Sequence, residues 1–274
     1  MNDSIHFIFQ NDLVVTEIKG DDFTDLFNRL STNNISDQTN LVTDSIFTNE
    51  NGRFIDVVSI WSIAPNSFMI SNSLNHDDLL SWINKYTFEE DISISEPLEK
   101  KVISIFSSNK DNNLNIFGEV KENEIVNKKV GDVELILAKT SFFNGHQTVN
   151  LIFNNDSKSI QSIESYLNSQ DILEMEDCQF NSFRIKNMIP ICGKEIINSY
   201  NPLEIGMSHL IDFDKGCYIG QEVIARLDTY DKIQRKLLML DNEKDSIIIS
   251  SKGCDVTSLD DAYCLAVVKK SIFN

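Results

Sequence analysis

The residues most able to do chemistry lie in one short segment, Asp214–Arg226, which reads D-K-G-C-Y-I-G-Q-E-V-I-A-R. Gly216 and Gly220 allow a tight turn there, and the pattern predicts a short helix over about 220–227. Cys217 would then lie just before a helix N-terminus, with Lys215 two residues away. The helix dipole and a nearby cation both favour a thiolate. The segment therefore predicts a thiol that acts as a nucleophile, a redox centre or a transient cluster ligand.

A structural interpretation of the same segment stays open at this point. Free cysteines are often small buried packing residues, and Cys217 could be one of them. Gln221 and Glu222 could equally be ordinary polar residues of a first helical turn. From residue spacing alone, both interpretations of the segment remain.

The other cysteines give no sign of a disulfide framework or a resident metal. They are Cys178, Cys192, Cys254 and Cys264, and with Cys217 they make an odd total of five without a C-x-x-C pair. The four histidines are equally scattered, so no compact Cys/His cluster suggests zinc or a self-contained iron–sulfur site. We therefore expect no stably bound metal or cluster.

Charge and hydropathy restrict the classes of partner, nucleic acids and membranes in particular, that the protein can bind. The formal net charge is −18, which repels the phosphate backbone, so naked nucleic acid is an unlikely partner. No window approaches the ~18 apolar residues of a membrane span, and the first residues lack the basic and apolar regions of a signal peptide. We expect a cytoplasmic protein without membrane contact.

The elements that position this segment follow from apolar periodicity and turn residues. Phe23, Leu26, Phe27 and Leu30 share one face of a helix that Asp22 precedes, and Asn51-Gly52 is a strong hairpin signal. Further helices are predicted from residue 75 and over 160–167. Strands are predicted over 13–18, 44–48, 53–58, 67–71, 101–106, 133–138, 148–153, 236–240, 246–250 and 265–269. This order indicates an α+β protein with mainly antiparallel sheets, a core of two interleaved subdomains over 1–234, and a small β-barrel-like unit over 235–274.

The string K-G-C-Y-I-G-Q-E, followed by V-I-A-R, resembles the signature of the YgfZ family, whose pattern is K-G-C-Y-x-G-Q-E with an arginine shortly after. Three further stretches resemble the same family: 17–35 (G-D-x followed by L-x-T-N-D), 51–56 (G-R-x-x-x-D) and 202–207 (P-x-E-x-G-L). The family shares the scaffold of the glycine-cleavage aminomethyltransferase (GcvT-like). In true aminomethyltransferases the cysteine segment resembles K-x-D-F-I-G instead, without a thiol. Cys217 therefore favours the YgfZ branch.

The resemblance implies a GcvT-like multi-domain scaffold around a central folate-sized cavity, with tetrahydrofolate as a ligand. It implies Asp56, Arg184, Glu195 and Glu204 as folate-binding candidates. Lys186 stands where the family has an acidic residue that would bind the pteridine, and Asp56-Val57 stands where aminomethyltransferases have two aspartates. A pteridine offers adjacent N–H donors, which suit a carboxylate and not a lysine.

The function implied is iron–sulfur cluster assembly or repair, with Cys217 and Lys215 as the reactive pair. Gly216 and Gly220 would shape the loop. Tyr218, Gln221, Glu222 and Arg226 would line or brace the site, at the edge of the cavity. The implied partners are iron–sulfur client or assembly proteins, and bacterial members are also associated with tRNA modification. Two alternatives remain: a folate-dependent aminomethyltransferase, and a degenerate folate-scaffold binding module in which Cys217 only packs.

Overall fold

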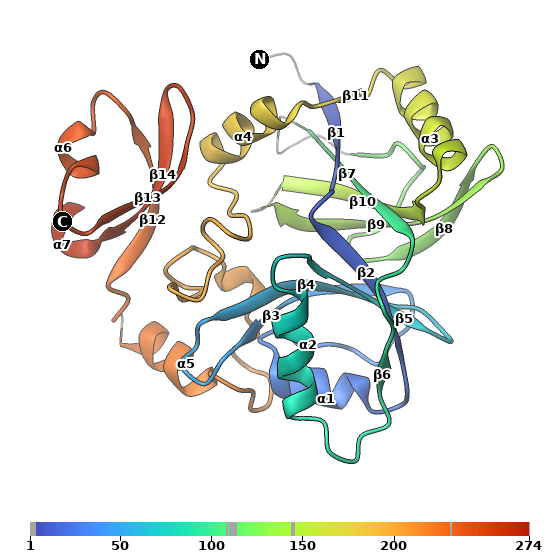
Figure 1. Ribbon diagram of the computed structural model, residues 1–274, viewed down its shortest axis with the longest axis horizontal. Coiled ribbons are helices and arrows are strands. Elements are labelled where there is room, and N and C mark those ends of the chain that lie inside the picture. The colour runs from blue at the N-terminus through green and yellow to red at the C-terminus, as the bar shows by residue number, and fades with distance from the viewer. Residues whose placement is uncertain (1–3, 108, 110–113, 144–145, 231, 274) are drawn as a thin grey trace.

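The computed structural model describes residues 4–107, 109, 114–143, 146–230 and 232–273. In these residues the strands form three sheets, mainly antiparallel, and the helices lie against them, so the fold is α+β (Figure 1). The chain starts in one large sheet, passes through the other and then returns, so the two large sheets are interleaved in sequence.

The first large sheet has the strand order β3-β4-β5-β2-β6. Helices α1 (Phe23–Leu30) and α2 (His76–Lys85) pack against one of its faces. Leu26 and Phe27 of α1 and Leu79 of α2 meet Val58 and Ile60 of β4 in one buried cluster, as the periodicity of the helices predicts. The strands are β2 (Leu13–Lys19), β3 (Leu41–Thr48), β4 (Phe54–Ser62), β5 (Ser67–Asn72) and β6 (Ser93–Ile94).

The second large sheet has the order β11-β1-β7-β10-β9-β8. Helix α3 (Ser157–Ser169) covers one face with Ile163 and Leu167, and Asp156 caps its N-terminus by accepting from the Ser159 backbone N–H. The strands are β1 (Ile5–Phe9), β7 (Lys100–Ser107), β8 (Ile125–Val130), β9 (Val133–Phe143), β10 (His146–Asn154) and β11 (Leu173–Glu174).

The two large sheets pack against each other through their remaining faces. Trp61 and Ile70 of the first sheet share a buried cluster with Val102 and Ile152 of the second. Helix α4 (Asp177–Lys186) follows β11 and leads into a long loop with a 3₁₀ turn, η1 (Ser208–Leu210), and then into α5 (Gln221–Thr229). The cysteine segment lies in this last stretch, beside the first sheet (Figure 1).

The third sheet is small, with the order β12-β14-β13, and stands to one side of the others (Figure 1). Its elements are β12 (Arg235–Asp241), α6 (Ser246–Ile249), β13 (Cys254–Leu259), β14 (Tyr263–Lys269) and α7 (Lys270–Phe273). The strand predicted over 246–250 is wrong. The backbone N–H groups of Ile249 and Ser250 bond four residues back, to Asp245 and Ser246, so the isoleucine run forms a helical turn that packs on the sheet.

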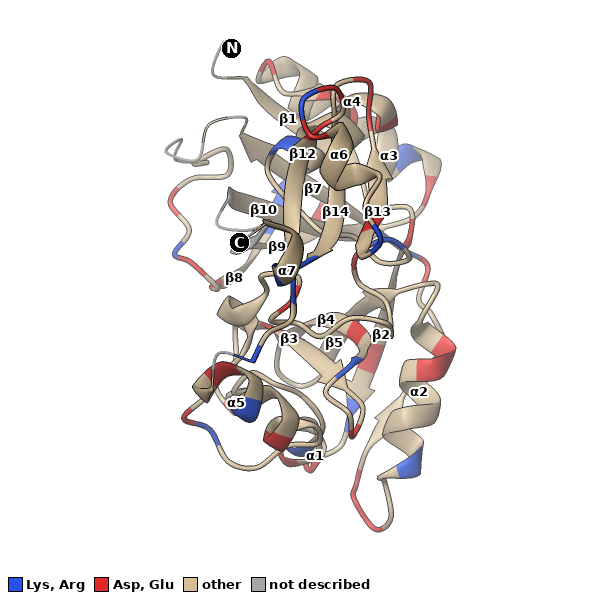
Figure 2. Ribbon diagram, turned by 90° about the vertical axis from the view of Figure 1, so that its left-hand side faces the viewer, with Lys and Arg blue, Asp and Glu red and all other residues tan. Residues whose placement is uncertain are grey.

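Acidic residues are scattered over helices and loops and are not gathered on one element (Figure 2). Within the described part of the chain, no helix is long and apolar enough to cross a membrane. The same residues contain no group of three or more side chains arranged to hold a metal ion.

Candidate functional site

A pocket of about 380 Å³ lies between the two large sheets, α4 and the 190–196 loop. Its apolar lining includes Phe9, Trp61, Val102 and Phe180. Its polar lining is Gln10, Asn11, Asp12, Asp44, Ser59, Asn72, Ser104, Asn150, Asp177, Asn181, Arg184 and Cys192. Apolar walls combined with polar groups that converge on the same cavity are typical of a small-molecule site. Of the four predicted folate-binding residues, Arg184 lines this pocket.

Asp56 points away from the pocket because β4 carries a β-bulge. Phe47 of β3 pairs with Asp56 but Thr48 pairs with Phe54, so Ile55 is the extra residue. Val57 consequently lines the pocket, while Asp56 accepts hydrogen bonds from the Asn72 N–H (2.9 Å) and the Asn75 side chain (3.1 Å). Burial raises the pKa of Asp56, and the Cys192 thiol donates to it as well (3.5 Å). Asp56 therefore orders the start of α2.

Arg184 and Glu195 form a buried ion pair, with side chains 3% and 0% exposed and N–O at 3.3 Å. Glu195 also accepts from the Ile191 N–H (3.1 Å) and from the hydroxyls of Thr257 (2.6 Å) and Ser258 (2.5 Å). These four donors occupy all of the roughly four hydrogen-bond acceptor sites of one carboxylate. Glu195 thus joins α4, the 190–196 loop and β13, and it has no acceptor left for a ligand.

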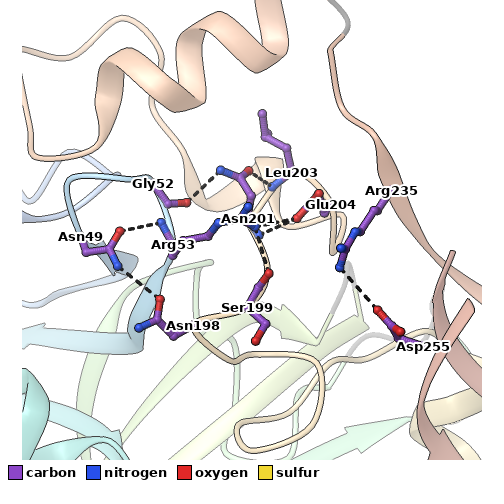
Figure 3. Close-up of polar contacts among 10 residues, drawn as sticks. All are labelled: Asn49, Gly52, Arg53, Asn198, Ser199, Asn201, Leu203, Glu204, Arg235 and Asp255. Carbon is purple, nitrogen blue, oxygen red and sulfur yellow. Dashed lines mark hydrogen bonds and ion pairs between the residues drawn. The ribbon is translucent and has the colours of Figure 1, made fainter. Parts of the chain in front are cut away.

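Glu204 also has a structural position (Figure 3). Its Oε2 accepts from Arg53 (3.0 Å) and from the Asn201 backbone N–H (2.9 Å). The Asn201 side chain in turn donates to the Gly52 carbonyl oxygen at 2.8 Å. Glu204 therefore fastens the β3–β4 turn to the 198–204 loop, and it is not among the residues that line the pocket.

Lys186, which occupies the family's acidic position, is exposed at the end of α4 with its ammonium 5.9 Å from the ring centre of Tyr263. Its side chain does not line the pocket, so it neither blocks a ligand there nor replaces the missing acid. Met188, at the family's glycine position, has φ +51°. This left-handed backbone is the conformation that a glycine would adopt without strain.

Asp44 is the pocket carboxylate that sequence reasoning missed. It lies on β3 directly opposite Ser59 of β4, on the pocket side of the sheet with Val57 and Trp61. Burial raises its pKa to about 6, although a hydrogen bond from Ser59 acts in the opposite direction. The sequence feature that could have identified it is its position in the hairpin. Asp44 lies four residues before Thr48, which ends β3, and pairs with Ser59 on the strand that follows the Asn-Gly turn.

Lys215 is partly buried at the C-terminal end of α1. Its ammonium donates to the Asn28 side chain (3.1 Å), to the Ser31 carbonyl (3.0 Å) and to the Asn33 carbonyl. Burial lowers its pKa to about 8. Carbonyls at a helix C-terminus are favourable partners for a cation, so Lys215 anchors the loop to α1. Its predicted role in activating Cys217 stays a prediction.

The other side of the loop is fixed by Tyr218, Ile219 and Gly220. Tyr218 is 7% exposed in the core, and the Ile219 carbonyl accepts from Thr48 Oγ1 at 2.8 Å. Gly220 has φ +86°, and a Cβ there would lie 2.6 Å from the Asn49 carbonyl oxygen. The loop therefore docks so closely on the β3–β4 turn that glycine is required.

Cys217 itself is exposed between these two anchors, so its thiol lies outside the buried core. A Cβ on Gly216, the residue before Cys217, would meet nothing within 4 Å, so the space beside Gly216 is open. Glu222 and Arg226 form an exposed ion pair on α5 (2.6 Å), and Gln221 is its first residue. None of the motif residues 215–226 lines the pocket, so the structure separates the thiol from the cavity lining.

Comparison with known proteins agrees with this architecture. The family model described as the GCVT N-terminal domain matches residues 8–215. A chloroplast putative transferase of Arabidopsis thaliana is 24% identical over 204 residues, covering 71% of this chain and 46% of that protein. An aminomethyltransferase of Thermotoga sp. (strain RQ2) is 22% identical over 281 residues, covering 93% and 76%.

The fold is shared with a solved structure. The glycine cleavage system aminomethyltransferase T from Bartonella henselae superposes with a TM-score of 0.73 at 11% identity, covering 98% of this chain and 79% of that one. Two of the curated relatives are longer: the chain spans 46% of the Arabidopsis protein and 59% of an aminomethyltransferase of Thermotoga petrophila. The family model matches well over half of the chain, and the fold agrees with it, so this chain belongs to the GCVT N-terminal domain family.

Proposed function

We propose that this protein is a YgfZ-like factor of iron–sulfur cluster assembly or repair, with Cys217 as its working thiol and a reduced folate as the ligand of its pocket. The observation that carries the proposal is the presentation of Cys217. It is exposed, while the residues on both sides of it are fixed by buried contacts.

This arrangement suits a thiol that meets a macromolecular partner. Lys215 and Gly220 fix the two ends of the loop, and the space beside Gly216 is open. One thiolate cannot hold a cluster by itself, because clusters usually take about four protein ligands. Cys217 would therefore engage a cluster, a persulfide or a partner's thiol transiently, and client or assembly proteins would supply the remaining ligands.

The test is complementation in a cell that lacks the protein, with the activity of an aconitase-type [4Fe–4S] enzyme as readout. We expect the wild type to restore that activity and Cys217→Ser to fail. Cys178→Ser is the matched control, because Cys178 is also exposed but lies on α4 outside the motif. Full complementation by Cys217→Ser would remove the thiol from the proposal.

The pocket fits a reduced folate in its chemistry. Its volume of about 380 Å³ lies in the range of ligand cavities, and its aromatic and aliphatic walls suit a flat ring system. Asp44 supplies a carboxylate inside, which a pteridine's N–H donors require. When bound, the folate would supply nitrogen atoms that carry one-carbon units. The residues of this chain would bind and orient the ring.

The alternative of aminomethyl transfer has less support in the site. Val57 occupies the pocket-facing position beside Asp56, so a carboxylate is absent where aminomethyltransferases are expected to have one. Tetrahydrofolate-dependent release of ammonia from an aminomethylated carrier, measured for the wild type and for Val57→Asp, tests this alternative. Turnover by the wild type would favour the transferase. Turnover only by Val57→Asp would mean that the scaffold has lost this chemistry.

A role in tRNA modification is also part of the YgfZ resemblance. The net charge of −18 opposes direct contact with the RNA backbone. In our proposal, any effect on tRNA passes through an iron–sulfur enzyme that acts on tRNA, and the protein itself works in the cytoplasm on protein partners.

A further inference from the structure

The buried carboxylates near the pocket differ in how many donors they already have. Glu195 accepts four hydrogen bonds and lies outside the pocket lining. Asp56 accepts four, from Asn72, Asn75, Cys192 and the Val57 backbone N–H, and points to α2. Asp44 lines the pocket, and within the described residues one side chain, Ser59, donates to it. A carboxylate has about four acceptor sites, so Asp44 keeps most of its capacity for a ligand.

A hydrogen bond from Trp61 within β4 leaves the proton of the Ser59 hydroxyl available for Asp44. The Trp61 indole N–H donates to Ser59 Oγ at 3.1 Å, so the hydroxyl proton is free to point across to Asp44. Asp44 and Ser59 are directly paired across the two strands, which places their side chains on the same face. The sheet therefore supplies one donor to the carboxylate of Asp44, and Asp44 lines the cavity.

The walls around Asp44 indicate the shape of the ligand. The apolar lining residues Phe9, Val57, Trp61, Ile70, Val102 and Phe180 suit the faces of a flat ring. On the second sheet, Gln10 donates to Ser104 and Ser104 donates to Asn150, with distances of 3.0 and 2.6 Å. This chain of bonds orients further polar groups of the pocket without using Asp44.

We propose that Asp44 is the anchoring residue of the pocket and accepts two adjacent N–H donors from the edge of a flat heterocycle, such as the 2-amino-4-oxo edge of a pterin. The proposal deepens the proposed function, because it names the group that would recognise the folate's ring. It gives Asp44 of β3 the task of binding the pteridine N–H donors, because Val57 and Lys186 stand at the positions where related proteins have carboxylates.

Two other carboxylates line the same pocket but lie in exposed positions. Asp12 follows β1 and Asp177 begins α4, and both are exposed to solvent. Hydrogen bonds to a carboxylate are strongest where water is excluded, as at the half-buried Asp44. Asp12 and Asp177 are thus matched controls, with the same chemistry at the mouth of the same cavity.

The test is calorimetric titration of the full-length protein with two probes, 5-formyltetrahydrofolate and unsubstituted pterin. We expect Asp44→Asn to weaken both by about 10- to 100-fold, because the amide turns a donor toward the ligand's donors. Asp12→Asn and Asp177→Asn should change the dissociation constants by less than about threefold, as for exposed charges. Far-ultraviolet circular dichroism and the melting temperature check that each variant is folded.

A second measurement keeps Asp44 in place, in case Asp44→Asn does not fold. The other ionisable groups that line the pocket are Asp12, Asp177, Arg184 and Cys192, and Arg184 is held by Glu195. With Asp12 and Asp177 both changed to Asn, binding of pterin should weaken as the pH falls below about 6, where Asp44 takes up a proton. Affinity that is constant between pH 5 and pH 7.5 would overturn the role of Asp44.

The outcomes separate this inference from the proposed function. If the wild type binds both probes and Asp44→Asn binds them equally well, Asp44 is not the anchor and the folate proposal survives. If the wild type binds pterin through Asp44 but not the folate, the anchor stands and the folate proposal fails. If neither probe binds, both are overturned.

Discussion

Replacing Gly220 with alanine probes the docking of the cysteine loop most directly. The backbone has φ +86°, and the new Cβ would lie 2.6 Å from the Asn49 carbonyl oxygen and 2.8 Å from Thr48 Oγ1. A left-handed backbone costs a non-glycine residue about 1–2 kcal/mol. Overpacking against groups that cannot move adds about 1–3 kcal/mol. The lower entropy of the unfolded alanine chain returns about 0.4–1 kcal/mol.

The expected net loss is about 1–4.5 kcal/mol of unfolding free energy, or a fall of roughly 2–10 °C in melting temperature for a chain of this size. Gly216→Ala is the control, because its Cβ would meet nothing within 4 Å and should change stability by less than about 0.5 kcal/mol. Differential scanning calorimetry of the two variants measures both values. Equal melting temperatures would refute the docked position of the loop on the β3–β4 turn.

Three further predictions concern single side chains. Met188→Gly should raise the unfolding free energy by about 0.5–1 kcal/mol, because it relieves a φ of +51°. Met239→Gly is the control, at a similarly exposed methionine in strand β12, and it should lower the unfolding free energy. If both variants change stability in the same direction, the backbone argument is contradicted. Asp44 has a pKa of about 6 in the folded protein, above that of an unfolded aspartate, so its ionisation reduces stability as the pH rises from about 4 through 6. Asp44→Asn should therefore stabilise the protein more at pH 8 than at pH 4.5, and a difference in melting temperature that does not change with pH would speak against the assignment. Iodoacetamide should modify the exposed Cys217 at least about 100-fold faster than Cys192, since burial and Asp56 hold the Cys192 pKa well above its usual range. Peptide mass spectrometry at successive times after addition of iodoacetamide compares the two modification rates. Similar rates would disprove the burial of Cys192.

The elements that local pattern determines could be predicted from the sequence. The apolar spacing of residues 23–30 gives α1, and Asn51-Gly52 marks the turn between β3 and β4. Strand β1 and helix α4 were not predicted. Helix α4 packs through Phe180 and Phe183 onto Phe106 of a strand far away in the chain, a contact that periodicity within α4 does not reveal.

The candidate site was predicted in part, for the same reason. The cysteine motif singled out the segment around Cys217, but residue spacing left open whether the thiol is exposed or packed, and the structure shows it exposed. The direction of Asp56 could not be predicted, because a single extra residue, Ile55, reverses which side of β4 it faces. Glu195 was expected to bind a ligand, but its donors include Thr257 and Ser258, which lie on β13 of the third sheet, about 60 residues later in the chain.

The contacts of Glu195 also set the order in which the protein can be completed during synthesis. Thr257 and Ser258 leave the ribosome about 60 residues after Glu195, a delay of roughly 3–12 s at ordinary elongation rates. Until then the carboxylate beside Arg184 lacks two of its donors, and a buried charge without its partners is unstable. Glu195 and Arg184 therefore gain their full set of contacts only when the last sheet has been made, so a nascent chain that has already formed both large sheets still has an incomplete pocket wall.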